Sequence, residues 1–193
     1  MTDKSTPEKK TAKNPARLVF SVGMIFLVIL CDQITKWMVT ELIVRPANGG
    51  QSIDLMTWIT TLPSKVSYAQ FEVLPFYNTV MVWNHGVSFG LFNNHSTENA
   101  LLLVAISLVI ALILLIWMFG ATNKYASLGL ALAIGGAFGN IIDRVRFGAV
   151  IDYIDIHAYG YHWPAFNVAD SAIVVGIGIV IIQSLFFEKR TDK

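Results

Sequence analysis

Charged side chains are scarce in this chain of 193 residues. Asp, Glu, Lys and Arg together make up 14% of it, against about 25% in an average soluble domain. So little charge excludes an intrinsically disordered chain, and the composition also excludes a collagen-like repeat and a nucleic-acid module with a basic surface. Hydrophobic residues account for 54%, the mean hydropathy is +0.57, and the apolar residues fall in long blocks. The composition therefore predicts a membrane protein with several spans.

Cysteine pairs and several catalytic motifs are also missing. The single cysteine, Cys31, excludes an internal disulfide and a cysteine-based zinc site, and its apolar neighbours predict a small buried residue. The chain has no Gly-x-Ser-x-Gly motif and no phosphate-binding loop. His157 and His162, with Asp152 or Asp155, are candidate metal ligands, but the histidine spacing departs from the i, i+4 pattern of helical zinc sites. We therefore expect neither a metal nor another cofactor.

Long apolar runs are abundant. They predict four transmembrane helices over about 18–39, 100–121, 125–142 and 170–188, each near the ~20 residues needed to cross ~30 Å of hydrocarbon. A buried helix of a soluble protein would be shorter and would carry a polar stripe. The expected fold is a membrane all-α four-helix transmembrane bundle that forms a single integral-membrane domain over 18–188.

The distribution of basic residues predicts the orientation of the bundle. Lysines and arginines occur in a leader over 1–17, at Lys124 in the turn between the second and third predicted helices, and in a tail over 189–193. Because positive charge favours the cytoplasmic side, we expect both termini and this turn in the cytoplasm. The segments over about 40–98 and 143–169 then lie on the outer, periplasmic side.

The first outer segment has two distinct parts. Residues 76–83 are rich in β-branched and aromatic side chains and precede a turn signal, which predicts a strand. Residues 46–70 contain two prolines and two adjacent glycines, which predict an irregular surface excursion. From position alone, we expect the strand and the excursion to cover a substrate as a lid.

Polar groups converge on the outer end of the bundle. Asp32, Asp143 and Asp170 each stand at the end of an apolar run, and Asp152 lies between the last two runs. A charge at the centre of a membrane helix costs about 2.5–3.5 kcal/mol on insertion scales, so such groups persist where they face protein or water. The same level receives five further polar residues: Lys36, Asn84, Asn140, Arg144 and Asn167.

Spacing gives each group a first interpretation. Asp32 and Lys36 are four residues apart and predict an ion pair on one helix face. Asn140, Asp143 and Arg144 follow a glycine-rich stretch and predict scaffolding around a site. Asp152 and Asp170 remain as candidates for a catalytic carboxylate pair. Spacing alone leaves the alternative open that Asp170 only caps the last helix.

Five short strings of residues contain these polar groups. They are Asp32-Gln-Ile-Thr-Lys36, Asn84-His-Gly-Val-Ser-Phe89, Gly135-Gly-Ala-Phe-Gly-Asn-Ile-Ile-Asp-Arg144, Val150-Ile-Asp-Tyr153 and Phe166-Asn-Val-Ala-Asp170. In this order the strings resemble the lipoprotein signal peptidase family, the bacterial type II signal peptidases. Each string alone is weak, but five in order across a four-span chain form a specific match.

The resemblance implies a metal-free aspartyl endopeptidase that removes signal peptides from prolipoproteins carrying a diacylglyceryl cysteine. It places this activity at the outer surface of the bacterial cytoplasmic membrane, adds a small extracytoplasmic β-sheet to the bundle, and implies membrane lipid and globomycin-type inhibitors as partners. We expect a monomer without a nucleic-acid partner. By resemblance the catalytic pair is Asp152 and Asp170. The positions that support this pair are Asp32, Lys36, Asn84, Gly86, Asn140, Asp143, Arg144 and Asn167.

Two departures from the family pattern and two rival functions remain. The segment between Lys36 and Asn84 is longer than is usual for the family, with the extra length in 46–70. In the second string, His85 and Val87-Ser88 stand where small residues, threonine or arginine are more usual. A small membrane carrier or proton-relay protein would also use carboxylates at one depth, although it would favour the midplane. A metal-dependent lipid phosphotransferase is the third possibility, which insensitivity to chelators would exclude.

Overall fold

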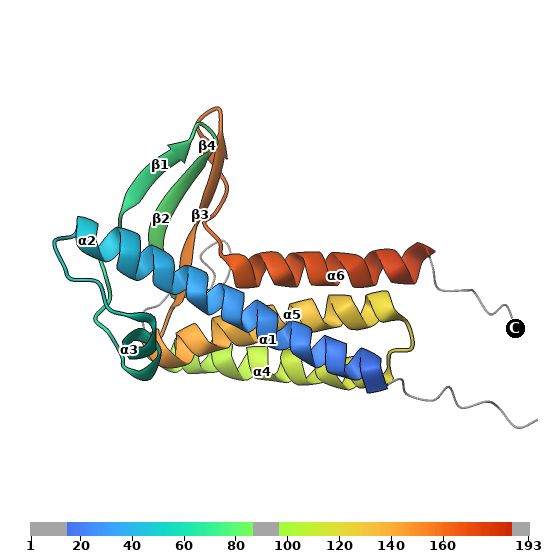
Figure 1. Cartoon of the computed structure of the whole chain (residues 1–193). Coiled ribbons are helices and arrows are strands. Elements are labelled where there is room, and N and C mark those ends of the chain that lie inside the picture. Colours follow the sequence, from blue (N-terminus) through green and yellow to red (C-terminus); the bar gives the residue numbers. More distant parts are fainter. Residues whose placement is uncertain (1–14, 87–96, 187–193) are drawn as a thin grey trace, which may run out of the picture.

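The computed structural model of the protein describes residues 15–86 and 97–186 (Figure 1). The predicted tail over 189–193, most of the predicted leader over 1–17 and the last three residues of the second string lie outside these ranges. Within the described ranges, four helices are long and apolar enough to cross a membrane. Together with a small antiparallel sheet at one end, they confirm the predicted fold class.

The four long helices differ in extent from the predicted runs. Helix α1 covers Pro15–Trp37 and continues without a break through the π-helical stretch η1 (Met38–Val44) into α2 (Arg45–Ala47). Helix α4 covers Thr97–Gly120, α5 covers Lys124–Phe147, and α6 covers Val168–Phe186. The continuous helix over Pro15–Ala47 rises about 1.5 Å per residue, so it is longer than the ~30 Å of hydrocarbon it would cross. Part of it therefore extends beyond the apolar layer.

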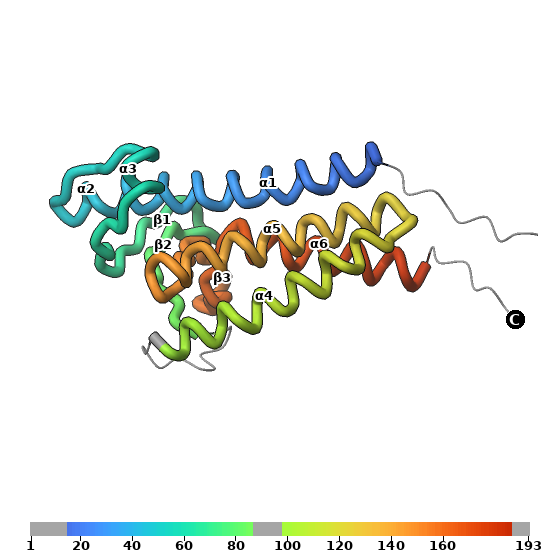
Figure 2. The backbone as a smooth tube through the Cα atoms, turned by 90° about the horizontal axis from the view of Figure 1, so that it is seen from below, coloured from blue at the N-terminus to red at the C-terminus, as the bar shows by residue number. Residues whose placement is uncertain are grey.

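Helix α5 lies at the centre of the bundle, between α4 and α6 on one side and α1 on the other (Figure 2). Its apolar window is 72% buried, against 17–28% for the other three helices. The glycines and alanines of α5 allow this close packing. A Cβ atom on Gly136 would collide with the carbonyl oxygen of Ala169 on α6, and one on Gly135 would lie 2.8 Å from Cβ of Val28 on α1.

The end of α5 corrects two predictions. The helix was expected to stop at Ile142 but continues to Phe147, because Gly148 adopts the left-handed conformation that ends it and donates to the carbonyl of Arg144. Asp143 and Arg144 therefore belong to the last turns of a buried helix and not to an outer loop.

Cys31 was predicted to be buried, yet it is exposed on α1.

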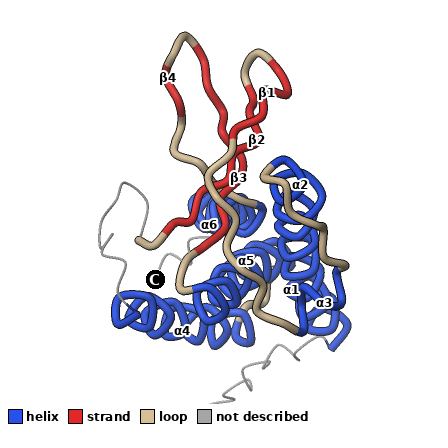
Figure 3. Tube along the Cα trace, turned by 90° about the vertical axis from the view of Figure 1, so that its left-hand side faces the viewer, coloured by secondary structure: helices blue, strands red, loops and turns tan. Residues whose placement is uncertain are grey.

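A four-stranded antiparallel sheet stands on the side of α6, at the end of the bundle away from the start of α1 and the end of α6 (Figures 1 and 3). Its order is β1 (Gln70–Leu74), β2 (Tyr77–Asn84), β3 (Val150–Ala158) and β4 (Tyr161–His162). The predicted strand over 76–83 corresponds to β2. Strand β3 joins α5 to the sheet, and it pairs with β2 in a register that places Asp152 opposite Val82. The sheet therefore brings the outer segments of the two halves of the chain together.

The excursion over 46–70 is anchored to the bundle by tryptophans and one arginine. It contains the short helix α3 (Leu55–Thr60), whose Trp58 is fully buried, with its ring centroid 6.0 Å from that of Phe147. The guanidinium of Arg146 lies 4.2 Å from the Trp58 ring centroid. Trp37 donates to the carbonyl of Ile53, and Trp83 donates to that of Val66. Side-chain contacts with α1, α5 and β2 therefore fix this segment.

Candidate active site

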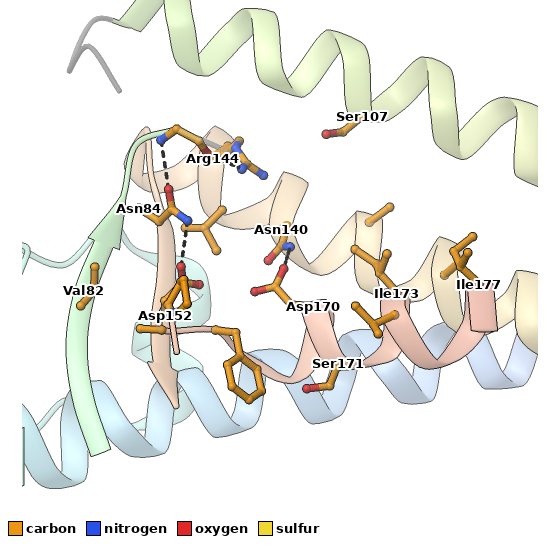
Figure 4. Close-up of a pocket in the computed structure, with 18 of the residues that line it drawn as sticks. Val82, Asn84, Ser107, Asn140, Arg144, Asp152, Asp170, Ser171, Ile173 and Ile177 are labelled. Atoms are coloured by element: carbon orange, nitrogen blue, oxygen red, sulfur yellow. Dashed lines mark hydrogen bonds between the residues drawn. The ribbon is translucent and has the colours of Figure 1, made fainter. Parts of the chain in front are cut away.

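A cavity of about 1090 Å³ opens at the end of the bundle that carries the sheet, between α4, α5 and α6. Part of its wall is apolar and includes Ile173 and Ile177 of α6 (Figure 4) and Ile110 of α4. Its outer end is polar, and the polar groups come from four separate segments of the chain. They are Asn84 and Gly86 near β2, Asn140 and Arg144 on α5, Asp152 on β3, and Asp170 on α6.

Asp152 lies on β3 with its side chain buried at the polar end of the cavity. Its Oδ2 accepts a hydrogen bond from Nδ2 of Asn84 at 2.9 Å, and its Oδ1 accepts one from Nδ2 of Asn167 at 2.8 Å. Burial, followed by the negative charge of Asp170, raises the pKa of the Asp152 carboxyl to about 7. This carboxyl is therefore able to hold or release a proton near neutral pH.

Asp170 stands in the first turn of α6. Its Oδ2 accepts from the backbone N–H of Asn167 at 3.2 Å, and the Asn167 side chain accepts from the Asp170 N–H at 2.8 Å. This reciprocal arrangement is a capping box in which Asn167, the residue before α6, is the N-cap, so Asp170 is not itself the cap that the alternative above supposed. The capping box occupies one oxygen of Asp170, while Oδ1 accepts from Nδ2 of Asn140 at 2.8 Å at the cavity (Figure 4). Asp170 thus completes the capping box of its helix and lines the cavity at once.

Asn167 connects the two carboxyl groups. It is fully buried, its Nδ2 donates to Asp152, and its backbone and side chain bond Asp170. The same Nδ2 lies 3.2 Å from Oδ1 of Asn140. One residue thus bonds both carboxyl groups, with its side chain to Asp152 and its backbone N–H to Asp170, and the two groups lie at one end of one cavity.

Arg144 places a positive charge at the polar end of the cavity without forming an ion pair with Asp152 or Asp170. Its Nη2 donates to the carbonyl of Gly86 at 3.2 Å, and the N–H of Gly86 donates to Oδ1 of Asn84 at 3.0 Å. The Nε of Arg144 is buried and has no partner among the described residues. A planar guanidinium with a free donor is suited to bind a carbonyl oxygen that enters the cavity.

Asp32, Lys36 and Asp143 form a buried ion cluster behind the cavity. The Lys36 ammonium lies 2.8 Å from Asp32 and 2.6 Å from Asp143. The predicted Asp32–Lys36 contact is present, but the bond from Lys36 to Asp143 joins α1 to α5 and was not foreseen. Sequence reasoning also missed Gln33, which donates to Asp143 at 3.0 Å. Its place inside the first string was the available signal.

Other candidates lie elsewhere. His157 and His162 stack on the sheet with ring centroids 4.8 Å apart, and His162 pairs with Asp155. None of these three residues lines the cavity. No residue of the excursion over 46–70 lines it either, so this segment does not cover the cavity in this structure. The strand is different, because Val82 and Trp83 do border the cavity.

The chain is similar to known proteins over most of its length. The family described as signal peptidase (SPase) II matches residues 24–186. A lipoprotein signal peptidase of Rhodopseudomonas palustris is 37% identical over 175 residues, covering 89% of this chain and 93% of its own. One of Methylobacterium radiotolerans is 46% identical over 123 residues, covering 64% of this chain and 72% of its own. A solved structure of a bacterial membrane enzyme aligns with a TM-score of 0.64 at 28% identity, covering 91% of this chain and 93% of that one.

Proposed function

Because this chain belongs to the signal peptidase II family, we propose that it cleaves diacylglyceryl-modified prolipoproteins with Asp152 and Asp170 as its catalytic pair. Family membership makes it a bacterial membrane protease that removes signal peptides from lipoproteins. The observation that supports the pair is the shared cavity end, where Asn167 bonds both carboxyl groups. No other aspartate or glutamate among the described residues lines this cavity.

The proposed chemistry divides acid and base work between the pair. One aspartate, ionised, removes a proton from water as the water oxygen attacks the scissile carbonyl carbon. The other, protonated, donates a hydrogen bond to the carbonyl oxygen. The tetrahedral intermediate collapses when the C–N bond breaks and the amide nitrogen gains a proton. The two titrations are coupled, so the proton belongs to the pair and not to one residue.

The shape of the cavity suits a lipid-bearing peptide. Its apolar wall over α4 and α6 accommodates a hydrophobic chain, while its polar end holds the acids. A lipidated cysteine would keep the scissile bond near the membrane surface with its acyl chains in lipid. The basic residues near both termini and at Lys124 support cytoplasmic termini and a periplasmic site.

The direct test is an incubation of the purified full chain with a precursor that carries diacylglycerol on its cysteine. We expect cleavage of this precursor and none of the unmodified one, and we expect a chelator to leave the rate unchanged. A rate lost on chelation would support a metal enzyme instead. No cleavage under any condition, with an activity that depends on membrane potential, would support the proton-relay alternative.

The raised pKa of Asp152 predicts the pH dependence of the rate. Because burial and Asp170 raise it to about 7, the pair keeps one proton up to that pH and loses it above. We therefore expect kcat to fall as the pH rises beyond about 7, since the proton that polarises the carbonyl is lost. Returning the enzyme to neutral pH should restore the rate, which separates titration from unfolding. A kcat that stays constant up to about pH 9 would contradict the assignment.

A further inference from the structure

The ion cluster of Asp32, Lys36 and Asp143 has no solvent exposure at any of its three side chains. Two carboxylates and one ammonium leave an uneven charge in a buried site, where even a neutral pair often stabilises no more than apolar residues would. A contribution to stability therefore explains this cluster poorly. The hydrogen bonds that its two carboxylates accept from backbone N–H groups explain it better.

Each carboxylate of the cluster also holds a backbone N–H group. Asp143 Oδ2 accepts from the N–H of Ile151 at 3.1 Å, and Asp32 Oδ1 accepts from the N–H of Ala169 at 3.0 Å. Ile151 is the residue before Asp152, and Ala169 is the residue before Asp170. Lys36 thus holds β3 through Asp143 and α6 through Asp32. In each case the peptide group held is the one before a candidate acid.

Lys36 makes a third contact that reaches Asp170 by another route. Its Nζ lies 3.4 Å from Oδ1 of Asn140, whose Nδ2 donates to Asp170 at 2.8 Å. An ammonium can only donate a hydrogen bond, so it orients the Asn140 side chain with Oδ1 toward Lys36. The amide NH2 group of Asn140 is then directed toward Asp170.

We infer that Lys36, through Asp32 and Asp143, is a positioning residue that sets the spacing of Asp152 and Asp170. The inference rests on the proposed function, because it assumes that these two aspartates react. Lys36 draws the two carboxylates together, and they in turn fix the peptide groups that precede the two acids. Without the ammonium, the carboxylates repel each other and β3 and α6 separate.

The test replaces Lys36 by methionine, which has a similar length and no charge. We expect kcat to fall about 100-fold, since a displacement of about 1 Å between reacting groups has that cost. KM for the lipid-modified precursor should stay within about threefold, because the apolar wall of the cavity is untouched. The kinetic constants and the melting temperature are measured in the same detergent.

A second variant, D32N/K36M/D143N, keeps the site testable if K36M does not fold. It removes all three charges, while its amide oxygens still accept from Ile151 and Ala169. We expect a folded protein with kcat about tenfold below wild type, above that of K36M, and with KM little changed.

The matched control is the second buried ion pair on the same helix. Glu41 is fully buried, pairs with Arg45 at i, i+4, and accepts from the N–H of Ile53 at 3.2 Å, but it holds no reacting group. We expect E41Q/R45M to lower the melting temperature with kcat within about twofold of wild type. If its kcat falls as far as that of K36M, the inference is overturned, because general destabilisation then explains both.

Two further outcomes would also overturn it: a folded K36M, or a folded triple variant, with the kcat of wild type. The variants Asp152→Asn and Asp170→Asn separate this result from the proposed function. If they are inactive while K36M is unimpaired, only the positioning role fails. If they remain active, the catalytic pair fails and the positioning role with it.

Discussion

Asparagine at position 152 or 170 is expected to lower kcat about 10³-fold, the size of a lost general acid or base. The amide is nearly isosteric with the carboxyl group, but it can neither take a proton from water nor carry one to the carbonyl oxygen. Both positions are needed because the mechanism uses one ionised and one protonated group at the same time. The effect should appear in single-turnover cleavage of the lipid-modified precursor, with binding largely retained.

The control for this prediction is Asp155→Asn. Asp155 lies on the same strand as Asp152 and is also buried, but it pairs with Asn78 and His162 on the sheet. We expect its replacement to leave kcat within about twofold of wild type. Cleavage at a near wild-type rate by either Asp152→Asn or Asp170→Asn would remove that residue from the catalytic pair.

Valine at Gly176 is expected to disrupt the packing of α5 against α6. A Cβ atom at this position would collide with the carbonyl oxygen of Gly129 and would lie 2.8 Å from the backbone nitrogen of Ala133. Backbone atoms cannot turn aside as a side chain can, so we expect a loss of about 3 kcal/mol or more in the free energy of unfolding. Activity should fall as well, since α5 carries Asn140 and α6 carries Asp170.

Gly178 provides the comparison for this variant on the same helix. A Cβ atom there meets no heavy atom within 4 Å. We expect Gly178→Val to keep the melting temperature and the cleavage rate near those of wild type. Equal destabilisation by both substitutions would mean that loss of glycine from α6, and not the approach of α5, is responsible.

The sequence by itself determined the number of candidate spans and the end of the bundle at which the polar groups gather. Helix length is set by the thickness of the hydrocarbon, so charge-free runs identify the helices without tertiary information. The parity of the crossings then brings Asp32, Asp143, Asp152 and Asp170 to one end of the bundle. The Asp32–Lys36 contact was also predictable, because a separation of four places two side chains on one helix face.

Local spacing failed where a partner came from another segment. Asp143 was expected to act with its near neighbours Asn140 and Arg144, but in the structure it bonds Lys36 on α1 and the backbone of β3. The excursion over 46–70 looked free to cover the cavity, yet burial of Trp58 fixes it against Phe147. Contacts of this kind depend on the rotation of each helix about its axis and on which side chains bury most apolar area.

Only the tertiary structure decided that Asn167 bonds both candidate acids and that one lysine holds the peptide groups before them. The period of a helix or strand states which face a residue shares with its neighbours along the chain. It does not state how β3 is set against α6, because their relative position follows from the close approach of α5 and α6 at small residues. The sequence determined which polar residues could form a site and that they gather at one end of the bundle, while packing between helices determined their separation and their partners.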